Sequence, residues 1–258
     1  MITRVLSAGL LAGLVAGLAI ALLQNFTTTP LILEAETYEN AAPEKTAYGP
    51  AKLVLASADA SSLPLILVHG PEGHGDHGEE AWAPADGAER IVYTSIATIG
   101  ASVGFAFLLL AAMLIAGDRI DERQAMVWAA AGFAATGLAP AVGLSPELPG
   151  MVAADLVSRQ GWWLLTALST AAALWLFLRN DSVAMRALAV VLLLAPHVIG
   201  APHVMDADAS KVPAELAARF AATSLAVHAA LWLATGFAVG AIWPRLAGVG
   251  ASVGVAKT

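Results

Sequence analysis

Hydrophobic residues in this chain gather into six long runs that alternate with polar stretches. A helix needs about 20 apolar residues, at a rise of about 1.5 Å each, to cross the hydrocarbon core of a bilayer. The pattern therefore predicts an all-α, polytopic membrane protein with about six transmembrane helices in a single membrane domain. The predicted spans are residues 5–23, 94–116, 125–142, 160–178, 183–200 and 216–243.

The first run follows Arg4, so it also has the look of a signal peptide. At about 19 residues, however, it is long enough to span a bilayer. Gly9, Gly13 and Gly17 recur four residues apart within it, with an alanine before each. Small residues at this spacing let a neighbouring helix approach closely. We therefore expect this helix to be retained as part of the bundle.

The longest polar stretch, residues 24–93, is predicted to be a loop outside the cytoplasm. Pro30 is expected to end the first helix, and the part near 41–64 is rich in Ala, Pro and Ser, as linkers are. A later polar stretch contains Pro146 and Pro149. Their fixed φ angles predict an ordered, non-helical turn between two spans.

Composition supports the membrane class and excludes several others. The chain is 58% hydrophobic and 13% charged, whereas soluble domains carry about 25% charged residues. It contains no cysteine, which excludes disulfides, iron–sulfur clusters and thiolate metal sites. The net charge of −7 disfavours a nucleic acid as partner.

The distribution of basic residues orients the chain in the cytoplasmic (inner) membrane. Six spans place both termini on one side, and Lys and Arg concentrate in short cytoplasmic segments. The favoured orientation is N-in and C-in, and most of the 20 acidic residues then face outward, where they attract cations. The basic residues on the inner side are Arg4, Arg119, Arg123, Arg179, Arg186, Arg245 and Lys257.

One segment of the long loop combines metal-ligating side chains with glycines. Imidazole and carboxylate groups suit Co, Ni, Zn, Mn or Fe(II), and glycine lets the backbone bend around an ion. A divalent metal captured at the membrane surface is one interpretation, and a polar loop without a ligand is the other. The candidate ligands in this segment are His69, His74, His77, Glu79 and Glu80.

Other candidate ligands gather on the same predicted outer side. An ordered outer metal site is predicted from Glu34, Glu36, Glu147, His197 and His203. His228 lies about 20 Å into the last span at the helical rise, so it is a candidate for a deeper metal position. The alternative for His228 is a hydrogen bond to a Ser or Thr of another helix. The alternative for His197 is a helix-end residue bonded to a loop.

Three other classes of function remain open to test. Haem ligation by His197 and His228 would give an electron-transfer protein, although the two residues lie at different depths. Glu147, Asp155 and His203 contain the groups of an acid–base enzyme, but no nucleophile motif or cofactor loop accompanies them. A structural or assembly subunit without its own substrate is the third. No GxxxxGK[ST] loop is present, so we do not expect ATP hydrolysis or enzyme activity.

The chain resembles the predicted cobalt transporter subunit family, CbtA. Its Pro-Glu-Leu-Pro-Gly and Ala-Pro-His runs are the most specific points of similarity. The runs that carry the resemblance are Arg4–Gly13, Pro30–Glu39, Gly143–Gly150 with Ala154–Asp155 and Arg159–Trp163, and Leu193–Pro202.

The resemblance implies a membrane protein for cobalt uptake, linked to cobalamin biosynthesis. It implies Co²⁺ as the transported ion, with no permanently bound cofactor, although the residues themselves also suit Ni²⁺ or Zn²⁺. It further implies a small, single-helix, His-bearing partner subunit called CbtB. The family is usually described with fewer membrane helices than the six predicted here. Assembly into a homo-oligomer is left open, and so is a non-transporting, metal-binding or assembly role.

Overall fold

The computed structural model describes residues 1–40, 84–85, 87–203 and 210–255. These residues form helices and no strands, which confirms the all-α prediction for this part of the chain. In order the elements are α1 (Ile2–Phe26), α2 (Thr28–Asn40), α3 (Ala88–Ala116), α4 (Glu122–Phe133), the π-helical turn η1 (Ala134–Leu138), α5 (Ala139–Ala141), α6 (Leu156–Arg179), α7 (Val183–Ile199) and α8 (Ala214–Val255).

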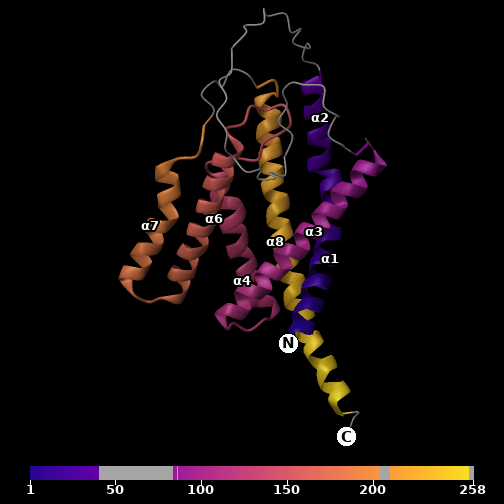
Figure 1. Ribbon diagram of the computed structural model, residues 1–258, viewed down its shortest axis with the longest axis vertical. Helices are drawn as coiled ribbons and strands as arrows, with labels where there is room; N and C mark the ends of the chain where they lie inside the picture. The colour runs from indigo at the N-terminus through magenta and orange to yellow at the C-terminus, as the bar shows by residue number, and fades with distance from the viewer. Residues whose placement is uncertain (41–83, 86, 204–209, 256–258) are drawn as a thin grey trace, which may run out of the picture.

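The long helices run alongside one another between two ends of a bundle (Figure 1). We call the end where α1 finishes and α3, α6 and α8 begin the loop end. The opposite end, which carries the N-terminus, is called the terminal end. Helices α1, α3, α4 and α8 pack together, and α6 and α7 form a hairpin beside them.

Four helices in the described part are long and apolar enough to cross a membrane, which confirms the membrane class. They are Ile2–Phe26, Ala88–Ala116, Leu156–Arg179 and Ala214–Leu246. A shorter apolar helix, Val183–Ile199, occupies the fifth predicted span. The third predicted span falls on α4, η1 and α5, which follow one another without a gap. The number of six spans stays a prediction.

Part of the predicted loop 24–93 is helical. The first helix ends at Phe26, close to the predicted break, but α2 then begins at Thr28. Pro30 does not prevent this, because a residue in the first turn of a helix needs no backbone N–H donor. Leu31 and Ala35 of α2 are buried in a small core with residues from the start of α8, and this contact anchors the segment.

The glycine-rich face of α1 packs directly on α3, as its spacing predicts. A Cβ atom added at Gly13 would lie 2.3 Å from the Cα atom of Val103, and one at Gly17 would lie 2.7 Å from the Cα atom of Ile99. Side chains at these positions would push the two helices apart. Ala8 and Ala12 of the same helix are fully buried in the main core. Helix α1 therefore packs as an integral part of the bundle, and its retention stays a prediction.

The π-helical turn η1 interrupts the helix that begins with α4. Within it, the N–H of Ala139 donates to the carbonyl of Ala134, one residue further back than in an α-helix. Pro140, one residue later, has no N–H to give to the carbonyl of Thr136. The turn also brings Gly137 against α8, where an added Cβ atom would lie 3.3 Å from Cδ2 of His228. The irregularity thus lies beside the candidate site.

Candidate functional site

A cavity of about 630 Å³ enters the bundle from the loop end, between η1, the proline turn, α6 and α8. We call it the Glu147 cavity. Glu147 and Arg159 line it near the loop end, and Thr136 and His228 line it deeper in the bundle. Gln160, Ser145 and Ser224 add polar groups, while Trp163, Leu164 and Leu225 supply apolar wall. This cavity brings two predicted ligands, Glu147 and His228, onto one surface.

A second cavity of about 270 Å³ lies between α1, α2, α3 and α8. We call it the Gln24 cavity. The hydroxyl of Thr98 donates to Oε1 of Gln24 at 2.8 Å across its α1–α3 wall. Ser224 and His228 line this cavity as well as the Glu147 cavity. Ser224 and His228 of α8 therefore lie on the wall of both cavities.

His228 is held by a hydrogen-bond network with Thr136 and Trp232. Its Nε2 atom lies 3.2 Å from Oγ1 of Thr136 and 3.0 Å from Nε1 of Trp232. The indole N–H of Trp232 also points at the Thr136 hydroxyl, at 2.9 Å. That hydroxyl donates to the carbonyl of Gly132 at 2.8 Å. The interhelical hydrogen bond that the sequence left as an alternative is thus present, and the residue lines two cavities as well.

Aromatic rings enclose the imidazole. The ring of Phe105 lies 5.8 Å from that of His228 and 4.9 Å from that of Trp232, in edge-on arrangements. Phe133 adds a third ring at 6.0 Å. Trp232 itself is buried in the main core. The apolar core between His228 and the terminal end is therefore well packed.

Glu147 forms an ion pair with Arg159, which lies in the first turn of α6. About a quarter of each side chain is exposed, at 24% and 28%. The Nε atom of Arg159 is buried and has no hydrogen-bond partner. Since buried donors usually have a partner, this arginine is incompletely satisfied beside a cavity that could admit a ligand.

Asp155 has a structural role at the same place. Its carboxylate accepts hydrogen bonds from the backbone N–H and the hydroxyl of Ser158, both at 2.9 Å, and so caps α6. These bonds from Ser158 hold the pKa of Asp155 below its ordinary value. The cap fixes the first turn of the helix that carries Arg159. The hydrogen bonds of Asp155 therefore support a helix-capping role and not the role of a catalytic acid.

The other acidic candidates lie on α2. Glu36 forms a two-pronged ion pair with Arg90 of α3, the geometry in which arginine binds a carboxylate most strongly. Glu34 is exposed, although it directly precedes the buried Ala35. Glu36 therefore ties α2 to α3 in the ligand-free protein, and a metal would have to displace Arg90 to reach it.

His197 and His203 lie at the loop end of α7 and just beyond it. The imidazole of His197 lies edge-on to Trp162, with ring centres 5.9 Å apart. The indole N–H of Trp162 donates to the carbonyl of Pro196 at 3.2 Å, so this part of the Ala-Pro-His run joins α7 to α6. His203 is exposed. Neither histidine is among the residues that line the Glu147 or Gln24 cavity.

Among the described residues, no three His, Asp or Glu side chains are placed to hold one metal ion. The structure thus does not bring Glu34, Glu36, Glu147, His197 and His203 together, and two of these carboxylates already have arginine partners. Their roles as individual ligands stay predictions. The loop candidates His69, His74, His77, Glu79 and Glu80 lie outside the described residues.

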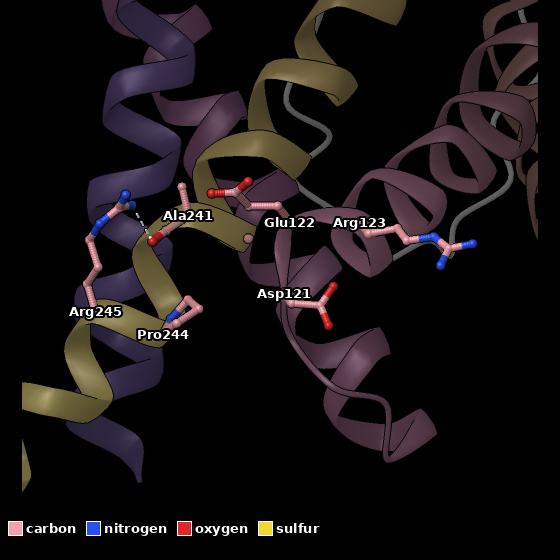
Figure 2. A pocket seen from close by; sticks show the side chains of 7 residues that line it. Asp121, Glu122, Arg123, Ala241, Pro244 and Arg245 are labelled. Atoms are coloured by element: carbon pink, nitrogen blue, oxygen red, sulfur yellow. Dashed lines mark hydrogen bonds between the residues drawn. The ribbon is translucent and has the colours of Figure 1, made fainter.

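A third cavity, of about 460 Å³, opens at the terminal end where α4 begins against α8. Figure 2 shows Asp121 and Glu122 on one side and Ala241, Pro244 and Arg245 on the other. Asp121 caps α4 by accepting from the N–H of Gln124 at 3.0 Å. The guanidinium of Arg245 donates to the carbonyl of Ala241. None of the residues of this cavity is among the predicted metal ligands.

Two residues of the His228 network were also missed from sequence. Trp232 follows His228 by four residues on one helix, and that spacing alone places the two side chains on one face. Thr136 lies 92 residues away along the chain. Its only sequence signal is a proline four residues later, which marks a helix irregularity.

An all-α bundle with several membrane-length helices, and with cavities that carry a few polar side chains into its interior, defines a multi-pass membrane protein. The chain belongs to the CbtA family, described as the probable cobalt transporter subunit, and the match covers residues 2–244. The family relationship predicted from the sequence runs is therefore confirmed over nearly the whole chain. Comparison with curated proteins gave no match, and comparison with solved structures gave none.

Proposed function

We propose that this protein carries Co²⁺ into the cell along the Glu147 cavity to His228, in support of cobalamin synthesis. The supporting observation is that one continuous cavity of about 630 Å³ is lined by a carboxylate at its loop end and an imidazole in the bundle interior. Both groups are ligands for divalent transition metals. An ionisable side chain inside a membrane bundle commonly marks a substrate path.

Entry begins at the acidic loop end, which faces outward in the predicted orientation. His69, His74, His77, Glu79 and Glu80 would collect the cation near the membrane surface, and Glu34, Glu36 and His203 would add capture positions there. The ion would then compete with Arg159 for the carboxylate of Glu147.

The cation would next reach His228, which also lines the Gln24 cavity. Ser224 lines both cavities beside it, and a hydroxyl oxygen can complete the coordination of a hard or borderline cation. Beyond this point the aromatic rings and the main core close the path. Further passage would require a movement of the bundle, driven by an ion gradient or by the single-helix partner that the family resemblance implies.

The test is uptake of radioactive cobalt by cells that produce the chain with its small partner, with Ni²⁺ and Zn²⁺ as competitors. His228→Ala is expected to reduce saturable uptake at least about tenfold, because the loss of even an outer-shell partner of a metal ligand commonly has an effect of about that size. Thr223→Val is the matched control on α8, since that hydroxyl only bonds its own helix, at the carbonyl of Arg219. Protein amounts in the membrane are compared in each case.

His197→Ala discriminates between two routes. We expect near-normal uptake, because His197 packs on Trp162 and lines neither cavity. Loss of uptake in His197→Ala, with normal uptake in His228→Ala, would move the route to the α6–α7 side and refute the path proposed here.

A non-transporting, metal-binding or assembly subunit is the second candidate. The well-packed core between His228 and the terminal end favours it, since a binding subunit needs no open passage. Saturable Co²⁺ binding by the purified protein, without uptake in cells that also contain the partner, would support this role instead of transport.

A further inference from the structure

We propose that Thr136 positions His228 to bind the metal through Nδ1, and that Trp232 competes for the other ring nitrogen in the empty protein. The inference rests on the proposed function, because it assigns atoms within the same metal path. It identifies a positioning residue, Thr136, on a different helix from the ligand. It also gives Trp232 an effect on affinity opposite to that of Thr136.

The hydrogen-bond capacity of Thr136 supports the first part. Its single hydroxyl proton goes to the carbonyl of Gly132 at 2.8 Å, so its oxygen is left as an acceptor. Nε2 of His228 lies 3.2 Å away. Histidines that bind metals nearly always donate their second ring N–H to an acceptor, which fixes the ring and its tautomer. Thr136 is placed to be that acceptor.

Nδ1 of His228 is the nitrogen that remains available. Both hydrogen-bond contacts of the ring nitrogens involve Nε2, and Nδ1 has no hydrogen-bond partner among the described residues. His228 lines both the Glu147 and the Gln24 cavity. A cation in either cavity therefore meets an imidazole whose Nε2 edge is already occupied by Thr136 and Trp232.

Trp232 opposes metal binding in this arrangement. Its indole N–H lies within hydrogen-bonding distance of both Nε2 of His228, at 3.0 Å, and the hydroxyl of Thr136, at 2.9 Å. A donor directed at Nε2 favours the tautomer with the ring proton on Nδ1, which cannot then bind a metal. In the metal-bound state the one ring proton lies on Nε2 and points to Thr136, and Trp232 bonds to Thr136 alone. The neutral ring neither gains nor loses a proton overall.

The local backbone explains why these side chains meet. The π-helical turn carries Thr136 toward α8, and π-turns often occur at functional positions. Gly132 leaves the space that the indole fills, because a Cβ atom there would lie 2.4 Å from Cζ3 of Trp232. The glycine at 132 makes room for Trp232 and the π-helical turn places Thr136, so both neighbours of His228 depend on the local backbone of the opposing helix.

The experiment measures Co²⁺ affinity of purified full-length protein in detergent, with a tag that contains no histidine. All variants carry alanine at His69, His74 and His77, so that loop binding does not mask the interior site. Thr136→Val is expected to weaken Co²⁺ binding about tenfold, and Thr136→Ser to restore it. Trp232→Phe keeps the ring but removes the N–H, and should tighten binding by roughly two- to tenfold, the effect of one competing hydrogen bond.

Nitrogen NMR of histidine-labelled protein supplies a readout that a purely structural role would not move. The signal of His228, assigned by its loss in His228→Gln, should show a proton on Nε2 when a diamagnetic divalent ion, Zn²⁺, is bound. A bound-state proton on Nδ1, or equal affinity in Thr136→Val and wild type, would overturn the proposal. Weaker binding in Trp232→Phe would overturn the role of the indole.

These outcomes are separable from failure of the proposed function. If His228→Ala binds Co²⁺ as wild type does, the metal path itself is wrong. If His228→Ala loses binding while Thr136→Val retains it, only the positioning role fails. Thermal unfolding of each variant, compared with Thr223→Val, establishes that the folded protein is being measured.

Discussion

Helix α6 carries an arginine–carboxylate pair at each end, and the two pairs have different surroundings. At the terminal end, Arg179 binds Asp118 at 2.8 Å. The same carboxylate accepts from the indole N–H of Trp128 at 2.8 Å and from the amide of Gln124 at 3.2 Å. At the loop end, Arg159 binds Glu147, a cavity adjoins the pair, and the arginine has an unpartnered Nε atom.

The difference separates a structural clamp from a place where a cation can bind. Asp118 joins α3, α4 and α6 through several donors, and none of the three cavities described above is lined by it. A carboxylate with a full set of partners gains little from a new cation, since it must give up existing bonds. Glu147 has fewer bonds to give up and faces open volume. The hydrogen-bond partners of an acidic residue therefore indicate better than its charge whether it can bind a cation.

The largest expected effect is on transport, and it should be confined to the loop-end pair. Glu147→Gln removes the charge that attracts the cation, so Co²⁺ uptake below saturation should fall about tenfold. The matched change Asp118→Asn should leave uptake per folded molecule within about twofold, because that carboxylate lines none of the three cavities described above. Uptake normalised to membrane protein gives the answer. Equal losses in both variants would remove the distinction between the two pairs.

The second effect is on stability, and it should be confined to the terminal-end pair. Burial opposes ionisation of Asp118, but the bonds from Trp128, Gln124 and Arg179 outweigh it and lower the pKa of Asp118 below 3.8. A lowered pKa in the folded state stabilises the protein above the unfolded-state pKa, and this contribution is lost as the pH falls through the folded-state value.

Asp118→Asn should therefore lower thermal stability in detergent at pH 7, by the roughly 1.5–3 kcal/mol of hydrogen bonds to a charged group. The gap between wild type and variant should shrink as the pH is lowered from about 5 through the folded-state pKa. Melting temperatures from pH 7 downward measure this. A gap that stays constant down to the lowest pH would show that the charge of Asp118 is not the source of the stability.

Much of this architecture could be predicted from the hydrophobic pattern, because helix length and apolarity are local properties. The glycine spacing of the first helix also predicted close packing, which Gly13 and Gly17 make against α3. The prolines of the turn at Pro146 and Pro149 marked a non-helical segment, and the structure has one there. The sequence does not predict helix α2, because proline commonly ends a helix, although a first-turn proline is compatible with one.

The site was harder to predict, since it depends on how each helix is rotated about its axis. The sequence placed Glu36 and Glu147 on one side of the membrane, but their arginine partners depend on contacts between helices. Arg90, for example, lies 54 residues from Glu36 along the chain. His228 was identified because an ionisable residue in an apolar run is conspicuous. Thr136 was not, because a threonine in a helix carries no such signal.

The smallest expected effect comes from replacing the arginine, instead of the carboxylate, in each of the two pairs. Arg159→Gln removes the cation that occupies Glu147, so Co²⁺ affinity should rise by roughly two- to fivefold, the effect of losing one partly exposed competing ion pair. Arg179→Gln should leave Co²⁺ affinity unchanged while it lowers the melting temperature, because Asp118 faces none of the three cavities. Both variants are measured by Co²⁺ titration in the background without loop histidines. Weaker binding in Arg159→Gln would mean that Arg159 holds Glu147 in the binding position, and the loop-end pair would then act as a fixed support for the site and not as a competitor of the cation.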